Sequence, residues 1–223
     1  MNKIILIETS TSLCSVALAE DGAVTAYRES SAQKAHASLT AVFVQEVLQE
    51  RGLKLSDCNA VCVSKGPGSY TGLRVGVSTA KGLCFGSGLP LIAVGTLDTL
   101  VAQATGEHRF IIPMIDARRM EVYSAVFENG KQTTPTTPVI VDENSFAEYL
   151  EQGSCLFIGD GAGKCADVIK HPNAHFCQCN PKASAMLSPA MDELKEKRFE
   201  DVAYFEPFYL KEFVATVSKK KLF

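Results

Sequence analysis

A glycine-rich turn over residues 64–74 is the stretch best suited to hold a ligand or a closely packed neighbour. It follows the apolar run 60–63 and precedes a helical pattern that extends to about Phe85. Glycine adopts positive φ and lets another backbone come close, proline stiffens a turn, and serine or threonine caps a helix. The residues concerned are Gly66, Pro67, Gly68, Ser69 and Thr71. This pattern fits a ligand loop and a corner between packed elements equally well.

A second glycine-rich turn, 159–164, follows a predicted strand and opens a helix, so its backbone N–H groups could bind an anion. It is not a Walker loop, because Ile158 stands where the first glycine belongs and Cys165 stands where serine or threonine belongs. The turn is therefore interpreted as either a structural turn or a residual ligand contact.

Four residues near the end of the chain resemble zinc ligands: His171, His175, Cys177 and Cys179. The Cys-x-Cys spacing matches no standard zinc finger. On a strand, the last three would share one face, which is too linear for easy tetrahedral coordination. The sequence therefore predicts no metal site. Spacing alone also assembles no Ser–His–Asp triad, and no nucleophile-elbow motif is present.

Composition is that of an ordinary globular protein. The chain has 223 residues, of which 46% are hydrophobic and 21% are charged. Its net charge of −3 gives no general attraction for nucleic acid. The apolar run at the N-terminus is too short for a signal peptide, and no stretch approaches the roughly 20 apolar residues of a membrane span. A cytoplasmic protein with reduced, mostly buried cysteines is expected, with no membrane contact.

The pattern of elements occurs twice. Each half predicts a strand, a polar turn, a strand, a tight turn, a strand and then helices alternating with strands, with a boundary near 106–108. We therefore predict an α/β fold with two similar βββαβα subdomains, residues 1–105 and 106–223, and a cleft between them. The predicted elements of the first half are strands 3–8, 14–19, 24–29, 60–63 and 89–94 and helices 30–52, 71–85 and 96–104; those of the second are strands 110–115, 121–127, 139–141, 155–158 and 175–179 and helices 145–152, from 163 to 170 and 181–197. The extended apolar segment 204–210 is expected to pack back on the body.

The helix predicted over 71–85 has one nearly bare side. Gly72, Gly76 and Thr79 form this side, and glycine inside a helix costs up to about 1 kcal/mol relative to alanine, so close packing should offset the cost. Packing within this chain and contact with a helix of another subunit are both consistent with it. The residues predicted for a partner interface, including the stripe of the preceding helix, are Leu39, Val42, Phe43, Gly72, Gly76, Thr79 and Ala80.

The segment Ile7-Glu8-Thr9-Ser10-Thr11, the turn 65–74 and the doubled topology together resemble the bacterial TsaB (YeaZ) family over essentially the whole chain. The resemblance implies the actin-like ATPase (ribonuclease H-like) fold. It also implies a role in making N6-threonylcarbamoyladenosine (t6A) at position 37 of tRNA. In that system the chain would be a non-catalytic subunit that binds the catalytic paralogue TsaD together with the ATPase TsaE, and would form a homodimer when alone. tRNA would be contacted only through the complex.

Several residues depart from the superfamily pattern, and these departures favour a chain that does not catalyse the reaction itself. Superfamily members hold nucleotide phosphates and metal through an Asp and a Gly in the first hairpin turn, where this chain has Glu8 and Ser10. Catalytic paralogues carry a His-x-x-x-His metal pair, where this chain has His36 and Thr40. The matching turn of the second half, 116–119, also lacks glycine. Residues of a vestigial nucleotide site would be Glu8, Thr9, Ser10, Asp116, Gly159 and Gly161.

The function expected from the resemblance is that of a scaffold, with no catalytic residue and no firm cofactor beyond weak ATP or ADP at the interface of the complex. The alternative is an ATP-dependent small-molecule kinase or ATPase that uses the cleft, and a glycoprotease-like peptidase is a distant third. Lys219-Lys220-Lys221 is interpreted either as a tRNA phosphate contact or, more simply, as a solvated tail.

Overall fold

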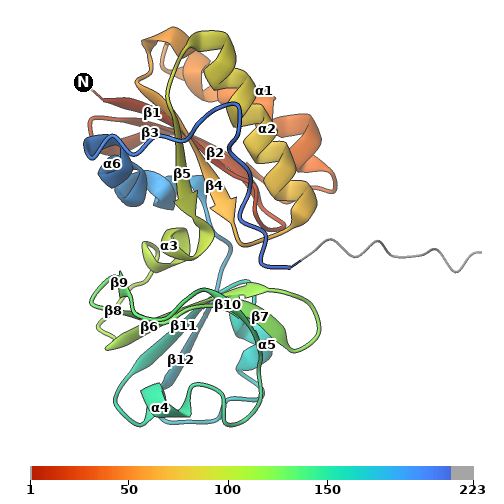
Figure 1. Cartoon of the computed structure of the whole chain (residues 1–223), viewed down its shortest axis with the longest axis vertical. Helices are drawn as coiled ribbons and strands as arrows, with labels where there is room; N and C mark the ends of the chain where they lie inside the picture. The colour runs from red at the N-terminus through yellow and green to blue at the C-terminus, as the bar shows by residue number, and fades with distance from the viewer. Residues whose placement is uncertain (1, 212–223) are drawn as a thin grey trace, which may run out of the picture.

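The computed structural model describes residues 2–211 and folds them into two subdomains, each built on one β-sheet (Figure 1). The first sheet has the order β3-β2-β1-β4-β5. β2 is antiparallel to β1 and β3, whereas β1, β4 and β5 are parallel. Its strands are β1 (Lys3–Glu8), β2 (Cys14–Glu20), β3 (Ala23–Ser30), β4 (Ala60–Gly66) and β5 (Leu91–Gly95).

The second sheet repeats this topology, with the order β10-β7-β6-β11-β12. Here too the hairpin strands are antiparallel and the last two strands are parallel to the first. The predicted duplication is thus confirmed. The strands are β6 (Phe110–Asp116), β7 (Glu121–Ser124), β10 (Thr137–Ile140), β11 (Cys155–Gly159) and β12 (Ala174–Gln178), with β8 (Phe127–Glu128) and β9 (Lys131–Gln132) as an added hairpin on β6.

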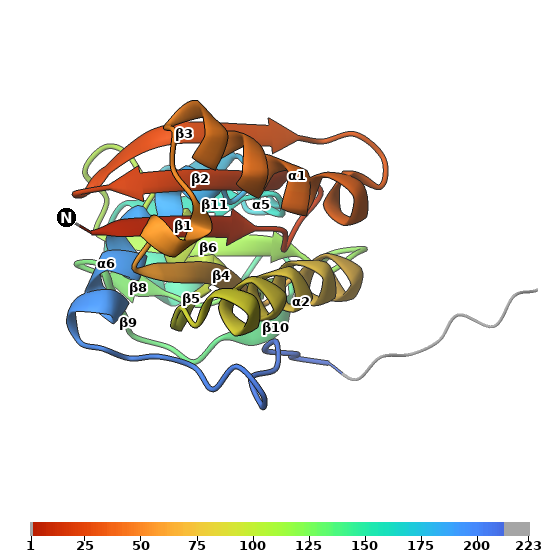
Figure 2. The same cartoon turned by 90° about the horizontal axis from the view of Figure 1, so that it is seen from above.

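Helices cover both faces of the first sheet (Figures 1 and 2). α1 (Ala35–Glu50) and α2 (Tyr70–Ser87) pack side by side on one face, over Ile5 and Ile7 of β1. Side chains alternate along a strand, so Ile4 and Leu6 lie on the opposite face. The remaining helices are η1 (Leu55–Asp57), α3 (Thr96–Val101), α4 (Ala147–Leu150), α5 (Ala162–Cys165), η2 (Ala183–Met186) and α6 (Leu187–Lys195). No helix within residues 2–211 is long and apolar enough to cross a membrane.

The division of the chain at residue 106 is wrong for the segment that follows β12. η2 and α6 return to the first subdomain, where Ala183, Met186 and Ala190 pack against Ile4 and Leu6. The return is favourable because it buries the face of the first sheet that α1 and α2 leave uncovered. The second subdomain therefore extends from β6 to β12, and its core contains none of the residues of α6.

The segment 204–210 packs back as predicted, although not along its whole length. Phe205 packs against the core beneath α2, and Leu210 packs against the cluster between the subdomains. Tyr204 is 84% exposed. Lys219–Lys221 lies outside the described residues.

Several helices and one strand have boundaries that differ from the prediction. The helix predicted from residue 30 begins at Ala35, because β3 stays paired with β2 as far as Ser30. The strand predicted over 121–127 is split into β7 and β8. α4 and α5 have only 4 residues each, so the second subdomain lacks helices comparable to the 16 residues of α1 and the 18 of α2.

The bare side of α2 packs within the chain. A Cβ atom at Gly72 or Gly76 would collide with Thr9 in the first hairpin turn, and one at Gly68 would collide with Ser10. The assignment of Gly72 and Gly76 to a surface for another subunit is therefore wrong. Gly72 and Gly76 have to be glycine because the turn that follows β1 leaves no room for a side chain at either position.

Two glycines of α2 provide a direct test of this contact. Gly76→Ala should destabilise the protein by more than about 2 kcal/mol, because the new methyl group would have to displace Thr9. Gly82→Ala, where an added Cβ meets nothing within 4 Å, should stabilise it by up to about 1 kcal/mol. Urea unfolding measures both changes, and equal stability of the two variants would contradict the packing.

Candidate functional site

A cleft of about 640 Å³ lies between the two subdomains. The first subdomain contributes the hairpin turn at Ser10–Ser12 and the start of α2, and the second contributes residues 115–118 and Asp160. Tyr123, His36 and Lys211 complete the lining. The predicted cleft is thus present, and it brings Ser10 and Asp116 of the predicted nucleotide site together. Glu8, Thr9, Gly159 and Gly161 do not line it.

Glu8 is fully buried behind the first turn instead of facing the cleft. Its Oε1 accepts hydrogen bonds from the Ser10 backbone N–H at 2.7 Å and from Ser64 Oγ at 2.8 Å. Burial raises the pKa of the Glu8 carboxyl, and the hydrogen bonds from Ser10 and Ser64 oppose this only in part. Glu8 Oε2 has no hydrogen-bond partner among the described residues. This carboxyl therefore holds the turn closed from within.

The start of α2 covers the same turn from the other side. The Ser69 backbone N–H donates to Ser10 O at 2.7 Å, and Thr9 Oγ1 donates to Gly72 O at 2.9 Å. Ser69 also caps the helix, since its Oγ accepts from the Gly72 N–H at 3.4 Å. Of the two predicted caps, Ser69 is the one used, and Thr71 lies inside the helix. Gly66 has a φ of 112°, and a Cβ there would lie 2.8 Å from Phe208 O.

The turn of the second subdomain is closed in a similar way. Asp116 Oδ1 accepts from the Arg118 N–H at 2.7 Å and from Lys164 Nζ at 2.5 Å. The Asp116 N–H donates to Asp160 Oδ1 at 2.9 Å. Burial raises the pKa of Asp160 to about 6, and the neighbouring Asp116 adds to the rise whereas the hydrogen bond from its N–H opposes it. A Cβ at Gly159 or Gly161 would collide with β6 or β7, so these glycines serve packing.

The remaining sequence candidates do not form a metal site. His36 hydrogen-bonds Thr11 O at 2.9 Å through Nε2, and Thr40 donates to the His36 carbonyl. The His175 ring lies 5.1 Å from that of His108. No group of three or more potential ligands within residues 2–211 is placed to hold a metal ion.

The side of α1 and α2 that faces away from the sheet carries exposed large apolar side chains beside small ones. Val42 is 42% exposed and Phe85 87%, and at Gly82 and Gly86 an added Cβ would meet nothing within 4 Å. Of the predicted interface residues, Phe43, Gly72, Gly76 and Ala80 are buried, Leu39 and Thr79 are half-buried, and Val42 alone is exposed. The outward face is thus rotated from the predicted one. Its exposed residues are Ala37, Ser38, Ala41, Val42, Gln45 and Gln49 on α1 and Thr71, Arg74, Ser78, Gly82, Phe85 and Gly86 on α2. We call this set the outer face.

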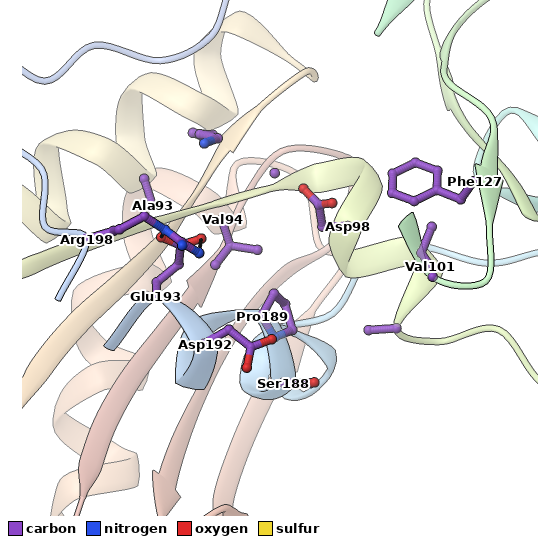
Figure 3. Close-up of a pocket in the computed structure, with 14 residues that line it drawn as sticks. Ala93, Val94, Asp98, Val101, Phe127, Ser188, Pro189, Asp192, Glu193 and Arg198 are labelled. Carbon is purple, nitrogen blue, oxygen red and sulfur yellow. Dashed lines mark hydrogen bonds and ion pairs between the residues drawn. The ribbon is translucent and has the colours of Figure 1, made fainter. Parts of the chain in front are cut away.

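A second cavity, of about 360 Å³, lies where α6 meets β5 and α3 (Figure 3). Glu193 and Arg198 on its rim are ion-paired, with Oε2 and Nε 2.6 Å apart. Burial raises the pKa of Asp98, and the charge of Lys65 opposes the rise. Sequence reasoning did not single out this cavity, because α6 was expected in the other subdomain.

Known proteins with similar sequences cover nearly the whole chain. The family described as "TsaD: tRNA N6-adenosine threonylcarbamoyltransferase" matches residues 29–219. The tRNA threonylcarbamoyladenosine biosynthesis protein TsaB of Escherichia coli (strain K12) is 34% identical over 96% of each chain. The protein of the same name from Haemophilus influenzae (strain ATCC 51907 / DSM 11121 / KW20 / Rd) is 42% identical over 93% of each. The chain belongs to the TsaB (YeaZ) family.

A solved structure agrees with this assignment. YeaZ from Pseudomonas aeruginosa superposes with a TM-score of 0.81 at 27% identity, covering 94% of this chain and 100% of that chain. The chain thus has the two-subdomain actin-like ATPase fold expected of a TsaB-family member.

The actin-like fold implies a nucleotide in the cleft, but the residues of this TsaB-family member do not fit one. The Ser10 N–H, which would have to face a phosphate, donates to Glu8. Asp116, which would have to face a metal ion, is bonded to Lys164 and the Arg118 N–H. The Ser10 N–H and one carboxylate oxygen of Asp116 are thus paired within the protein itself.

The buried Glu8 carboxyl predicts a pH-dependent stability. The pKa of Glu8 is higher in the folded state than in the unfolded state, where it is about 4.3. The contribution of Glu8 to the free energy of unfolding is therefore fully present below about pH 4.3. It is lost as pH rises through the folded-state pKa, by about 1.4 kcal/mol for each unit between the two pKa values. Glu8→Gln should lack this loss, so its stability relative to wild type should rise with pH. Urea unfolding across pH 4–8 measures the difference. The exposed Glu107→Gln is the control, and parallel profiles for wild type and Glu8→Gln would contradict the assignment.

Proposed function

We propose that the chain acts in tRNA threonylcarbamoyladenosine biosynthesis as a non-catalytic subunit that binds a TsaD-like catalytic paralogue together with a TsaE-like ATPase. Membership of the TsaB family gives the chain a role in this biosynthesis. The observation that carries the non-catalytic part of the proposal is the closed first turn. Its N–H at Ser10 is bonded to Glu8, and its outer side is covered by α2.

The outer face of α1 and α2 is the surface we propose for the partner. Glycine, alanine and serine let a second pair of helices approach closely, while Val42 and Phe85 provide apolar area. A paralogue with the same fold would present the same two helices, so the four helices would form a bundle. Without the paralogue, a second copy of this chain would occupy the face with two-fold symmetry.

Nucleotide and RNA would reach this chain only as part of the complex. Any ATP or ADP contact would be weak and shared with the partner at the interface. tRNA would be bound through the complex, and we propose that the protein works in the cytoplasm. No observation favours the alternative of a small-molecule kinase or ATPase over this proposal.

An omission assay tests the role. The catalytic paralogue, the ATPase partner, threonylcarbamoyl-adenylate, ATP and unmodified tRNA are combined with and without this chain, and t6A is quantified by mass spectrometry. We expect modification to fall to background on omission, and this chain alone to give none. Full modification without it would refute the role. The control restores activity by adding back wild type.

Variants of the outer face test where the partner binds. At Gly82 an added Cβ meets nothing within 4 Å, so Gly82→Leu adds bulk on the outer face and should weaken association at least about tenfold without lowering the stability of the fold. Ala147→Leu, on the exposed side of α4 in the second subdomain, is the matched control and should bind normally. Size-exclusion chromatography with light scattering measures the homodimer, and titration calorimetry measures the complex. Wild-type affinity for Gly82→Leu would exclude this face.

A further inference from the structure

Two of the eight cysteines differ from the others in their access to solvent. Cys177 is exposed and Cys179 is half-buried, whereas the other six are buried. The buried ones are Cys14, Cys58, Cys62, Cys84, Cys155 and Cys165. An oxidant in solution can therefore reach the Cys-x-Cys pair without unfolding the protein.

The geometry of β12 brings the two thiols to one side of the chain. β12 is an edge strand, in which Cys177 lies opposite Ile158 of β11. The extended pairing continues one residue past the strand, because the Cys179 N–H donates to Gly159 O at 3.4 Å. Alternate residues of an extended chain share one face, with Cα atoms about 6.6 Å apart. Disulfides span Cα separations of roughly 4.4–6.8 Å and need Cβ atoms about 3.5–4.5 Å apart, so the extended backbone at residues 177–179 would have to bend to form one.

The pair lies at the connection from the second subdomain back to the first. Cys179 packs against the cluster between the subdomains. Next to it, Asn180 Oδ1 accepts from Ser12 Oγ at 3.4 Å in the hairpin turn of the first subdomain. Three residues later, the Ala183 N–H donates to Ser15 Oγ at 2.9 Å in a buried hydrogen bond. A change in backbone spacing at Cys179 would therefore disturb both the Asn180–Ser12 and the Ala183–Ser15 hydrogen bonds.

We propose that Cys177 and Cys179 form a redox-sensitive dithiol that hydrogen peroxide converts to a disulfide, which loosens the connection between the subdomains. The Cys177 thiolate attacks one peroxide oxygen: an S–O bond forms, the O–O bond breaks, and the hydroxide that leaves takes a proton to become water. The Cys179 sulfur then attacks the sulfenic acid at Cys177. The S–S bond forms, the S–O bond breaks, and a second water leaves with the Cys179 proton.

The environment of the two sulfurs assigns these roles. Burial raises the pKa of Cys179 to about 11, and the neighbouring Cys177 adds to the rise. Cys179 is therefore a poor first nucleophile, and the exposed Cys177 is the thiol that meets the oxidant. This inference is independent of the proposed role in tRNA modification.

Peptide mass spectrometry tests the chemistry on the native full-length protein. The protein is treated with hydrogen peroxide, the peroxide is removed with catalase, and remaining thiols are alkylated in denaturant before digestion with trypsin. Cleavage after Lys170 and Lys182 releases a peptide that contains both cysteines and no others. We expect this peptide to be about 2 Da lighter than its reduced form and unalkylated, and dithiothreitol to restore two alkylation sites. The six buried cysteines should stay fully alkylatable.

Single variants separate the two roles. In Cys179→Ser, peroxide should leave Cys177 as a sulfenic acid that dimedone traps. In Cys177→Ser, Cys179 should remain an alkylatable thiol. An unmodified wild-type peptide, a sulfinic acid at Cys177 in wild type, or a disulfide between two chains would each overturn the proposal.

Hydrogen exchange tests the structural consequence. Oxidation should speed exchange of the Cys179 and Ala183 amide protons several-fold, because their acceptors are Gly159 O and Ser15 Oγ. Reduction should reverse the change. Unchanged exchange in fully oxidised protein would refute the effect on the connection.

Discussion

The close contact between the first hairpin turn and the start of α2 is the constraint on which the first subdomain depends. Glycines at 72 and 76 leave no side chain on that side of α2, so Thr9 can lie directly against the helix, and Gly68 in the preceding turn does the same for Ser10. The contact fixes where α2 lies on the sheet, and α1 packs beside α2. The glycines on the inner side of α2 therefore determine which side of the helix faces outward.

The same contact changes what the cleft can do. A hairpin turn at the edge of a sheet offers unpaired N–H groups, which other proteins use to bind anions. Here the Ser10 N–H is paired with Glu8, and the carbonyl of Ser10 is paired with Ser69. Lys164 similarly occupies Asp116 in the second subdomain. The Ser10 N–H and Asp116 Oδ1 are therefore already engaged by groups of this chain.

The two subdomains share a topology but differ in what covers them. The helices of the second subdomain, α4 and α5, have only 4 residues each, whereas α1 and α2 have 16 and 18. Within residues 2–211, two long helices lie side by side in the first subdomain alone, and on them exposed Val42 and Phe85 border small residues. The first subdomain is accordingly suited to bind a partner of similar shape. The second one shapes the cleft with residues 115–118 and Asp160.

The sequence by itself determined the repeated strand pattern, because period-two apolar runs and glycine turns are local signals. It also determined that Gly68, Gly72 and Gly76 must meet another part of the chain or a partner. The identity of that neighbour was decided by the tertiary structure, since Thr9 is more than 60 residues away from Gly72 in the chain. For the same reason, spacing did not reveal that Glu8 bonds Ser64, or that α6 returns to the first sheet. A helical pattern shows that a face is apolar or bare, but only the packed fold decides which face remains exposed.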